Sequence, residues 1–370
     1  MPRKPLALTV AVMAAIASAL VPGTAMAEPS TVAVTLGDSF ISGEAGRWQG
    51  NSLVTGSTSG GTDRASGDPA GVYGATHASG CHRSDVAPAL AADLAVDERI
   101  NLACSGATSA NVYRASNGGQ SFKGEAPQAD QLAGLARTRT VKLVVLSAGG
   151  NDLGFADIIT RCVTAYMGYY YCNPGEQSGV DSLLPTVRAN VGKAIDEVRA
   201  ALASAGQAPG SYRFVLQSYP SPLSRGADNR YREYGWTRTS TGGCPFWNGD
   251  LDWARDRLTG QLSDALASVA TAKGVTFLDL RDAFAGREVC AKASTQADST
   301  HPPAGATSEW VRWLVTGWTS SPGDRQESFH PNAYGQQAMA RCLTLIAQTT
   351  GLRYTCHNTP GQGPTSMYLT

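Results

Sequence analysis

The chain has 370 residues, and its 30 basic and 30 acidic side chains give a formal net charge of zero. This balance gives no reason to expect nucleic acid or an anionic membrane as an obligate partner. The length favours one large domain over two small ones, and no repeat, low-complexity tract or linker divides the chain.

The first 27 residues are expected to be a secretory signal peptide. Arg3 and Lys4 give a positive start, residues 6–21 are apolar and rich in small side chains, and an Ala-Met-Ala cleavage site ends at Ala27. The apolar run is short for a membrane span, and a retained N-terminal anchor is the alternative. We therefore expect the mature protein, residues 28–370, to be secreted as a single domain.

The first predicted strand covers residues 32–36, an apolar run that ends at Gly37, Asp38 and Ser39. Gly37 allows a sharp turn, so Ser39 falls at the carboxyl end of the strand, where open α/β sheets bind their ligands. A helix that starts there would offer free N–H groups to a developing negative charge. Gly-Asp-Ser is also an ordinary turn in which Asp or Ser caps a helix, so Ser39 is a candidate nucleophile that needs partners.

Strand and helix patterns alternate along the rest of the chain. Four further strands are predicted, over residues 100–103, 141–146, 212–217 and 275–280. Apolar side chains at helical spacing predict helices over residues 84–94, 184–202, 258–269 and 338–345. Long loops are expected at about 44–80, 154–180, 220–255 and 286–330. The alternation predicts an α/β fold with helices on both faces of a mostly parallel five-stranded sheet.

Two of these strands end in residues that suit contact with a ligand. Residues 100–103 run into Cys104, Ser105 and Gly106, and small residues after a strand let the backbone approach a bound molecule. Residues 141–146 are followed by Gly-Gly-Asn-Asp, which places Asn151 at a second strand end. The alternative for Asn151 is a turn residue with a local side-chain bond.

Eight cysteines follow the signal segment, and an even number in an exported chain indicates disulfides. No Cys-x-x-Cys pair is present, so a zinc ribbon is not expected. The count does not fix the pairing. Nearest neighbours in order would give the bridges Cys81–Cys104, Cys162–Cys172, Cys244–Cys290 and Cys342–Cys356.

A serine is a poor nucleophile at neutral pH unless a base takes its proton. The favoured base among the five histidines is His330, which is followed by Pro331 and preceded, three residues earlier, by Glu327. A carboxylate there could hold the imidazole in the right tautomer. His301 is also followed by a proline and is the competing candidate.

Together these segments resemble the GDSL or SGNH hydrolases. The turn that ends in Ser39 is similar to the first conserved block of that family, and Gly106 lies in a segment similar to the second. Asn151 and its neighbours are similar to the third block, and His330 with Pro331 is similar to the fifth. No Gly-x-Ser-x-Gly elbow is present, which disfavours an α/β-hydrolase. The resemblance implies a three-layer α/β/α fold with a flavodoxin-like sheet.

The resemblance also implies a serine ester hydrolase without a cofactor. Ser39 would attack the ester carbonyl, and His330 would accept its proton and return it to the leaving alcohol. The backbone N–H groups of Ser39 and Gly106 and the side-chain amide of Asn151 would hold the oxyanion. The family usually has aspartate where this chain has Glu327, and similar secreted actinobacterial members orient the histidine with a main-chain carbonyl. Both possibilities stay open.

The substrate is less well defined by the sequence. The expected late loops are rich in aromatic residues, namely Trp236, Phe246, Trp247, Trp253, Trp310, Trp313 and Trp318, and Tyr166, Tyr169, Tyr170 and Tyr171 form a second group. Aromatic residues near a site suit acyl chains or a lipid surface, although ordinary loop packing accounts for more than half of them. We therefore expect a monomer that cleaves lipid or short-to-medium acyl esters and touches lipid surfaces transiently.

Two other functions are weighed against this one. Aromatic side chains could instead stack on sugar rings, as in a deacetylase of acetylated polysaccharides. A secreted binding protein that has lost catalysis is the alternative from another class, and the complete set of Ser39, Gly106, Asn151 and His330 argues against it. No His and carboxylate cluster has metal-ligand spacing, and a calcium site of loop carboxylates stays open.

Overall fold

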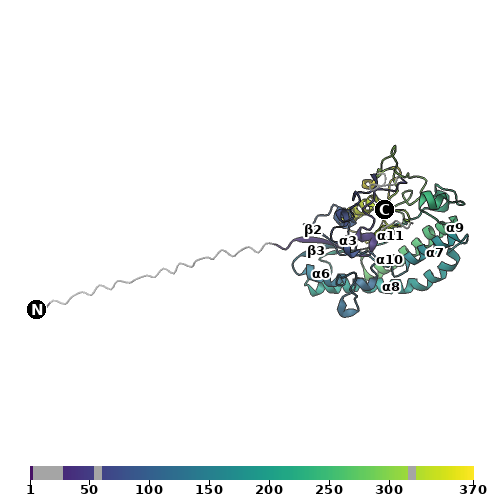
Figure 1. The fold of residues 1–370 in the computed structure, drawn as a ribbon. Coiled ribbons are helices and arrows are strands. Elements are labelled where there is room, and N and C mark those ends of the chain that lie inside the picture. The colour runs from purple at the N-terminus through teal and green to yellow at the C-terminus, as the bar shows by residue number, and fades with distance from the viewer. Residues whose placement is uncertain (3–27, 54–60, 316–321) are drawn as a thin grey trace.

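A sheet runs through the molecule (Figure 1). It has seven strands in the order β2-β1-β3-β4-β5-β6-β7. The computed structural model describes residues 1–2, 28–53, 61–315 and 322–370. The strands are β1 (Thr31–Gly37), β2 (Glu98–Asn101), β3 (Thr140–Ser147), β4 (Arg213–Gln217), β5 (Thr276–Asp279), β6 (Arg353–His357) and β7 (Tyr368–Leu369). Neighbouring strands are parallel from β2 through β6, and β7 is antiparallel to β6.

The five predicted strands correspond to β1–β5, and their order, 2-1-3-4-5, is the flavodoxin-like one. The central strands β1 and β3 are almost wholly buried, because helices cover both faces of a parallel sheet. The expected total of five strands is wrong, since β6 and β7 extend the edge. Most side chains of β6 are partly exposed, so its sequence lacks the apolar run by which buried strands are predicted.

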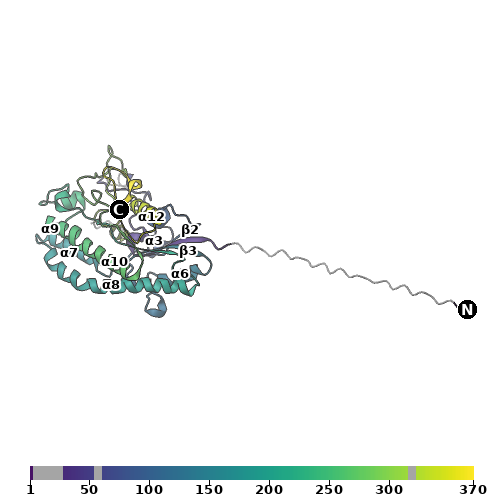
Figure 2. The same ribbon diagram turned by 180° about the vertical axis from the view of Figure 1, so that it is seen from behind.

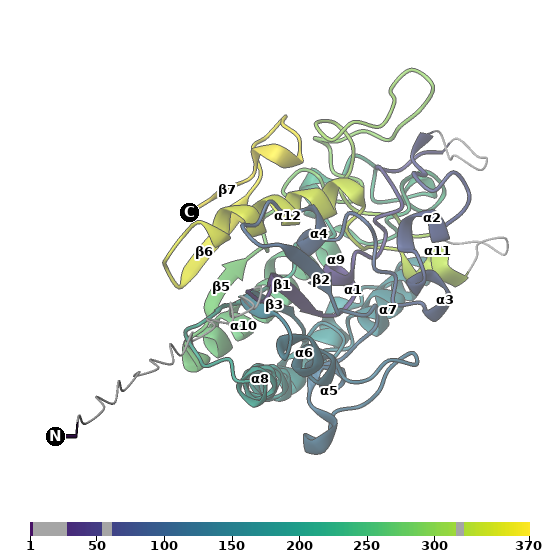
Figure 3. The same ribbon diagram turned by 90° about the vertical axis from the view of Figure 1, so that its left-hand side faces the viewer.

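Helices form a layer on each side of the sheet (Figures 2 and 3). One layer contains α6 (Gln128–Ala136), α8 (Asn173–Ser204) and α10 (Thr259–Lys273), with α7 (Phe155–Met167) beside them. The other contains α4 (Pro88–Ala91), which packs on α12 (Ala333–Ala347). The remaining α-helices are short, namely α1 (Ser39–Ser42), α2 (Ala70–Tyr73), α3 (Thr76–Ser79), α5 (Ser109–Val112), α9 (Asn248–Asp252) and α11 (Pro322–Gln326).

Two segments differ from their predicted structure. The helix expected over residues 84–94 is only the single turn of α4, because a residue before proline is pushed out of the helical region and Ala87 has ψ 148°. The loop expected over residues 154–180 is instead α7 and the start of α8. Buried Ile158, Cys162 and Ala165 recur at helical spacing along α7, a pattern that is typical of a helix.

The structure pairs the eight cysteines in the same four bridges as the nearest-neighbour expectation: Cys81–Cys104, Cys162–Cys172, Cys244–Cys290 and Cys342–Cys356. The predicted signal peptide, apart from its first two residues, and Trp318 lie outside the described residues. Within the described ranges no helix has the length and apolarity needed to cross a membrane.

The bridge that closes the longest loop is expected to contribute most to stability. Cys244 and Cys290 are 46 residues apart, whereas Cys162 and Cys172 are 10 apart. Chain entropy then predicts a loss of about 4 kcal/mol in unfolding free energy when serines replace the first pair, and about 3 kcal/mol for the second. Urea unfolding followed by tryptophan fluorescence measures both. This expectation would be contradicted if strong reductant left the unfolding free energy of the wild-type protein unchanged. A larger loss for the Cys162–Cys172 pair than for the Cys244–Cys290 pair would also contradict it.

Candidate active site

The turn after β1 places Ser39 at the carboxyl edge of the sheet. Gly37 has φ +130°, and a Cβ atom there would lie 1.8 Å from the Ser147 carbonyl oxygen, so only glycine fits. The next residue, Asp38, donates its N–H to that same oxygen at 3.1 Å. Its side chain accepts the Phe40 N–H at 3.2 Å and caps α1. Ser39 is therefore the first residue of α1, where backbone N–H groups lack intrahelical acceptors.

His330 lies directly against Ser39. Its Nε2 is 2.6 Å from the serine Oγ, and its Nδ1 is 3.1 Å from the main-chain carbonyl oxygen of Ser328. A carbonyl only accepts, so Nδ1 carries the proton and Nε2 is free to accept one from the hydroxyl. The two residues are 291 positions apart in the chain, so only the fold brings them together.

Glu327, considered for orienting the imidazole, is bonded elsewhere, and the group in contact with His330 Nδ1 is the Ser328 carbonyl. The two oxygens of the Glu327 carboxylate accept hydrogen bonds from Trp48 Nε1 and the Tyr73 hydroxyl, each at 2.5 Å. Phe329 has φ +62°, so residues 327–330 do not form a helical turn in which side chains three apart share a face. Burial raises the pKa of Glu327 to about 7. Its two hydrogen bonds anchor residues 326–330, here called the histidine segment, to the loop that contains Trp48.

The two other candidates face the same cavity as Ser39 and His330. Gly106 follows β2 with φ +87°, a conformation that glycine adopts readily. The Asn151 amide donates one N–H to the Ala107 carbonyl at 2.9 Å. That bond orients the side chain beside the Gly106 segment, and the amide has a second N–H for a ligand.

One residue that the sequence analysis did not select, Tyr219, links the Ser39 and Asn151 turns. Its hydroxyl donates to Asp38 Oδ2 at 2.5 Å and accepts the Gly150 N–H at 3.1 Å. Burial raises the pKa of Asp38 to about 7. Tyr219 follows β4 at the carboxyl edge of the sheet and lines the cavity, so the strand-end rule that identified Asn151 could have identified it.

The cavity beside Ser39 has a volume of about 380 Å³ and a mostly apolar wall. Its apolar side chains include Phe155, Ile159, Pro222, Leu262, Leu314 and Phe329. Within the ranges that the structure describes, the expected loop at 44–80 does not line it, and neither do the aromatic residues singled out in the sequence. Phe246, Trp247, Trp253 and Trp310 are buried elsewhere.

His301 lies apart from this site. It is exposed, and its Nδ1 lies 3.1 Å from the carboxylate of Asp298. In the ranges that the structure describes, no group of three or more His, Cys, Asp or Glu side chains could hold a metal ion. The site is thus built from Ser39, His330, Gly106 and Asn151 on an apolar cavity.

Activity should depend on the protonation of His330. Burial lowers its pKa from the ordinary 6.5, and the charge of Glu44 partly opposes this. Only neutral imidazole can accept the Ser39 proton, so kcat/KM should be full at higher pH and fall as pH drops through this lowered pKa. We expect an acid midpoint below 6.5, measured with a soluble ester from about pH 4 upwards. A midpoint above the ordinary value, or a flat profile, would contradict a histidine base.

The sequence is similar to that of known lipases. The sequence model of the GDSL-like Lipase/Acylhydrolase family matches residues 35–338. The chain is 31% identical to Lipase 1 of Streptomyces coelicolor over 198 residues, which cover 52% of this chain and 56% of that protein. It is 27% identical to Lipase 2 of the same organism over 350 residues, which cover 91% of this chain and 95% of that one.

A solved structure shares the fold. The crystal structure of phospholipase A1 from Streptomyces albidoflavus NA297 superposes with a TM-score of 0.52 at 22% sequence identity, covering 87% of this chain and 100% of that one. At this identity the likeness concerns the arrangement of helices and strands.

Proposed function

The chain belongs to the GDSL-like lipase/acylhydrolase family, and we propose that it is a secreted carboxylic ester hydrolase with Ser39 as nucleophile and His330 as base. The observation that carries the proposal is the 2.6 Å contact between Ser39 Oγ and His330 Nε2. A general base within hydrogen-bond distance of a hydroxyl is what activates a serine.

The reaction follows from this pair. Ser39 Oγ attacks the carbonyl carbon while His330 Nε2 takes its proton, and the Ser328 carbonyl holds the Nδ1–H. The N–H groups of Ser39 and Gly106 and the Asn151 amide stabilise the negative oxygen of the tetrahedral intermediate. The intermediate collapses as His330 returns the proton to the departing alcohol. Water, deprotonated by the same imidazole, then attacks the acyl-serine carbonyl. The bond from that carbon to Ser39 Oγ breaks as His330 passes the proton to Oγ, which releases the carboxylic acid and restores the enzyme.

The cavity supports an acyl chain longer than acetyl as the substrate group. Its walls carry apolar side chains from α7, α10 and the histidine segment, and burying apolar substrate surface there would be favourable at about 25 cal/mol per Å². An acetyl group would leave most of this surface without a contact. The alternative, a deacetylase of acetylated polysaccharides, would need polar groups for sugar hydroxyls along the same wall.

A substrate panel tests this assignment. Acid release is followed from acetyl, butyryl, octanoyl and palmitoyl esters, phosphatidylcholine and acetylated xylan, for the wild type and Ser39→Ala. We expect the wild type to prefer octanoyl or longer chains and the variant to be inactive. Preference for acetylated xylan would identify a deacetylase. Absence of hydrolysis throughout would favour the non-catalytic binding protein.

Transient contact with a lipid surface is part of the proposal. The aromatic patch consists of the exposed residues Tyr169, Tyr170, Tyr171, Tyr234 and Trp236. The rings of Tyr169, Tyr171 and Tyr234 contact Trp247, and Trp236 lines a small hollow with Tyr169 and Trp247. The patch lies beyond the carboxyl end of α7, whose amino-terminal residues line the cavity. Tyr and Trp favour the boundary between water and lipid, so the patch offers a contact for a lipid surface at the other end of α7.

Removing two rings of the aromatic patch should therefore separate two activities. For Tyr169→Ala with Trp236→Ala we expect about tenfold slower hydrolysis of phosphatidylcholine vesicles, because apolar area that docks on lipid is lost, and unchanged hydrolysis of a dissolved octanoyl ester. Tyr368→Ala, which removes an exposed tyrosine from β7, is the matched control. Equal rates on vesicles for all three proteins would argue against the patch.

A further inference from the structure

A fully buried carboxylate, Glu44, lies close to the site and is not used by the reaction above. Its Oε1 is 2.8 Å from His82 Nδ1, and its Oε2 accepts the Gln326 amide at 2.8 Å. Burial alone would raise the pKa of Glu44, but its bond to His82, the nearby imidazole of His330 and a bond from Ser105 outweigh burial and lower it. The carboxylate is therefore held in its charged form.

The side chain of Gln326 connects three parts of the site. Its Nε2 lies 2.8 Å from Glu44 Oε2, 2.8 Å from Ser105 Oγ and 2.9 Å from the Gly80 carbonyl oxygen. Gln326 ends α11, four residues before His330, and Ser105 directly precedes Gly106. The Glu44 N–H donates to the Ser39 carbonyl at 3.2 Å. The Gln326 amide thus connects the segments that contain His330, Gly106 and Ser39.

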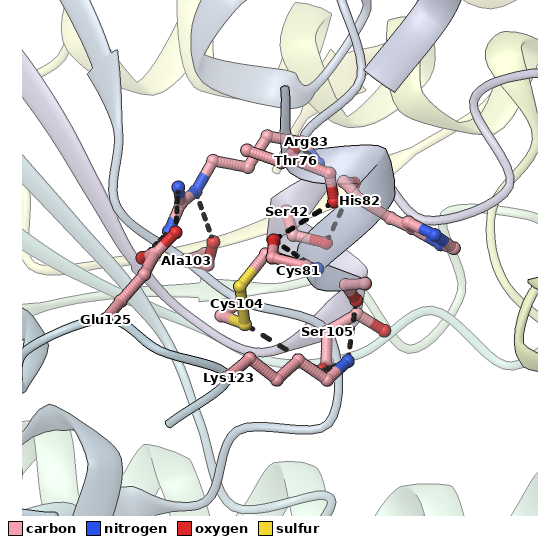
Figure 4. Close-up of a disulfide and its surroundings, with 12 residues drawn as sticks. Ser42, Thr76, Cys81, His82, Arg83, Ala103, Cys104, Ser105, Lys123 and Glu125 are labelled. Atoms are coloured by element: carbon pink, nitrogen blue, oxygen red, sulfur yellow. Dashed lines mark hydrogen bonds and ion pairs between the residues drawn. A yellow bond between two sulfur atoms is a disulfide. The ribbon is translucent and has the colours of Figure 1, made fainter. Parts of the chain in front are cut away.

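The groups that accept from Gln326 are themselves held by hydrogen bonds, and Figure 4 shows Lys123 and Cys81 beside Ser105. Lys123 Nζ donates to the Gly80 and Ser105 carbonyls at 2.6 and 2.7 Å. The Ser105 N–H donates to the Cys81 carbonyl at 3.1 Å, beside the Cys81–Cys104 disulfide. The acceptors of Gln326 therefore have a defined position before substrate binds.

The reaction creates a charge that the Ser328 carbonyl can only partly balance. When His330 takes the proton of Ser39 it becomes an imidazolium, and a carbonyl offers it a dipole where a triad aspartate would offer a full negative charge. A charged carboxylate within a buried region favours a nearby cation strongly because the effective dielectric constant is low. The ionisable groups around Glu44 are His82, His330, Lys123, Glu327 and Tyr73.

On the basis of the proposed function, we propose that Glu44 supplies the negative charge that stabilises the His330 imidazolium, and that Gln326 is the positioning residue that joins the histidine segment to it. The task of a triad aspartate is thereby divided. The Ser328 carbonyl orients the ring through Nδ1, and Glu44, which is bonded to Gln326, provides the charge. This assigns a role to a carboxylate five residues after the nucleophile.

Glu44→Gln tests the charge, because it keeps the shape of the side chain and its acceptor oxygen. The acid midpoint of kcat/KM should move down by about one pH unit, and kcat on an octanoyl ester should fall about tenfold at unchanged KM, since one pKa unit corresponds to a tenfold change. Glu197→Gln, at another buried carboxylate, is the matched control and should show the wild-type profile. An unmoved midpoint in Glu44→Gln would overturn the role of Glu44.

Gln326→Met tests the hydrogen bonds of the Gln326 amide separately, and it stays informative even if Glu44→Gln folds poorly. The residue is half-buried, and methionine preserves its length without hydrogen bonds. We expect kcat to fall about fivefold to tenfold at unchanged KM and unchanged melting temperature, with the acid midpoint near that of the wild type because Glu44 remains. A kcat of Gln326→Met equal to that of the wild type would overturn the positioning role of Gln326. Full hydrolysis by Ser39→Ala would instead overturn the proposed function itself.

Discussion

His330→Ala is expected to lower kcat/KM by about 10⁴-fold or more, because the hydroxyl of Ser39 then lacks a base. Adding Ser39→Ala to the same chain should cost little more, since groups that act as one unit lose their effect together. The structure gives the reason, as the two atoms that exchange the proton are 2.6 Å apart. Steady-state hydrolysis of an octanoyl ester by the two single variants and the double variant measures this.

The matched control for that experiment is His301→Ala. His301 is also followed by a proline but is exposed and bonded to Asp298, so its loss should leave kcat/KM within about twofold of the wild type. A large loss in His301→Ala, or multiplying losses in the double variant, would contradict the assignment of His330 as the base of Ser39.

Asn151→Ala is expected to lower kcat by about 10² to 10³ with a small change in KM, because an oxyanion donor acts mainly in the transition state. Asn151→Asp should be at least as damaging, since a carboxylate would repel the developing negative charge. Asn117→Ala, at a surface turn where the amide bonds Glu197, provides the control. A loss of less than threefold in Asn151→Ala would remove that side chain from the oxyanion site.

The sequence predicted those parts of the fold that depend on local patterns. Strands β1–β5 carry apolar runs because helices cover both faces of the parallel sheet, and strand ends with small or polar residues led to Ser39, Gly106 and Asn151. β6 escaped prediction because its side chains are mostly half-buried, so that its sequence lacks an apolar run. α7 was predicted as a loop because glycines and tyrosines flank it, although its buried side chains recur at helical spacing.

The contacts that complete the site could not be predicted in the same way. The role of Glu327 was judged from its spacing to His330, but the left-handed conformation of Phe329 turns the chain between them. Gln326 bonds to residues more than 200 positions away, and Tyr219 reaches Asp38 across 181 positions. Such contacts follow from the tertiary structure, which sequence spacing does not describe.

The central claim is that Ser39 is the nucleophile. Its most direct test is labelling with a fluorophosphonate, which phosphonylates activated serines, followed by mass spectrometry of the intact protein and its peptides. We expect one adduct, on Ser39, in parallel with complete loss of ester hydrolysis, and no adduct in Ser39→Ala. An adduct on another serine, or unchanged hydrolysis in Ser39→Ala, would contradict the account.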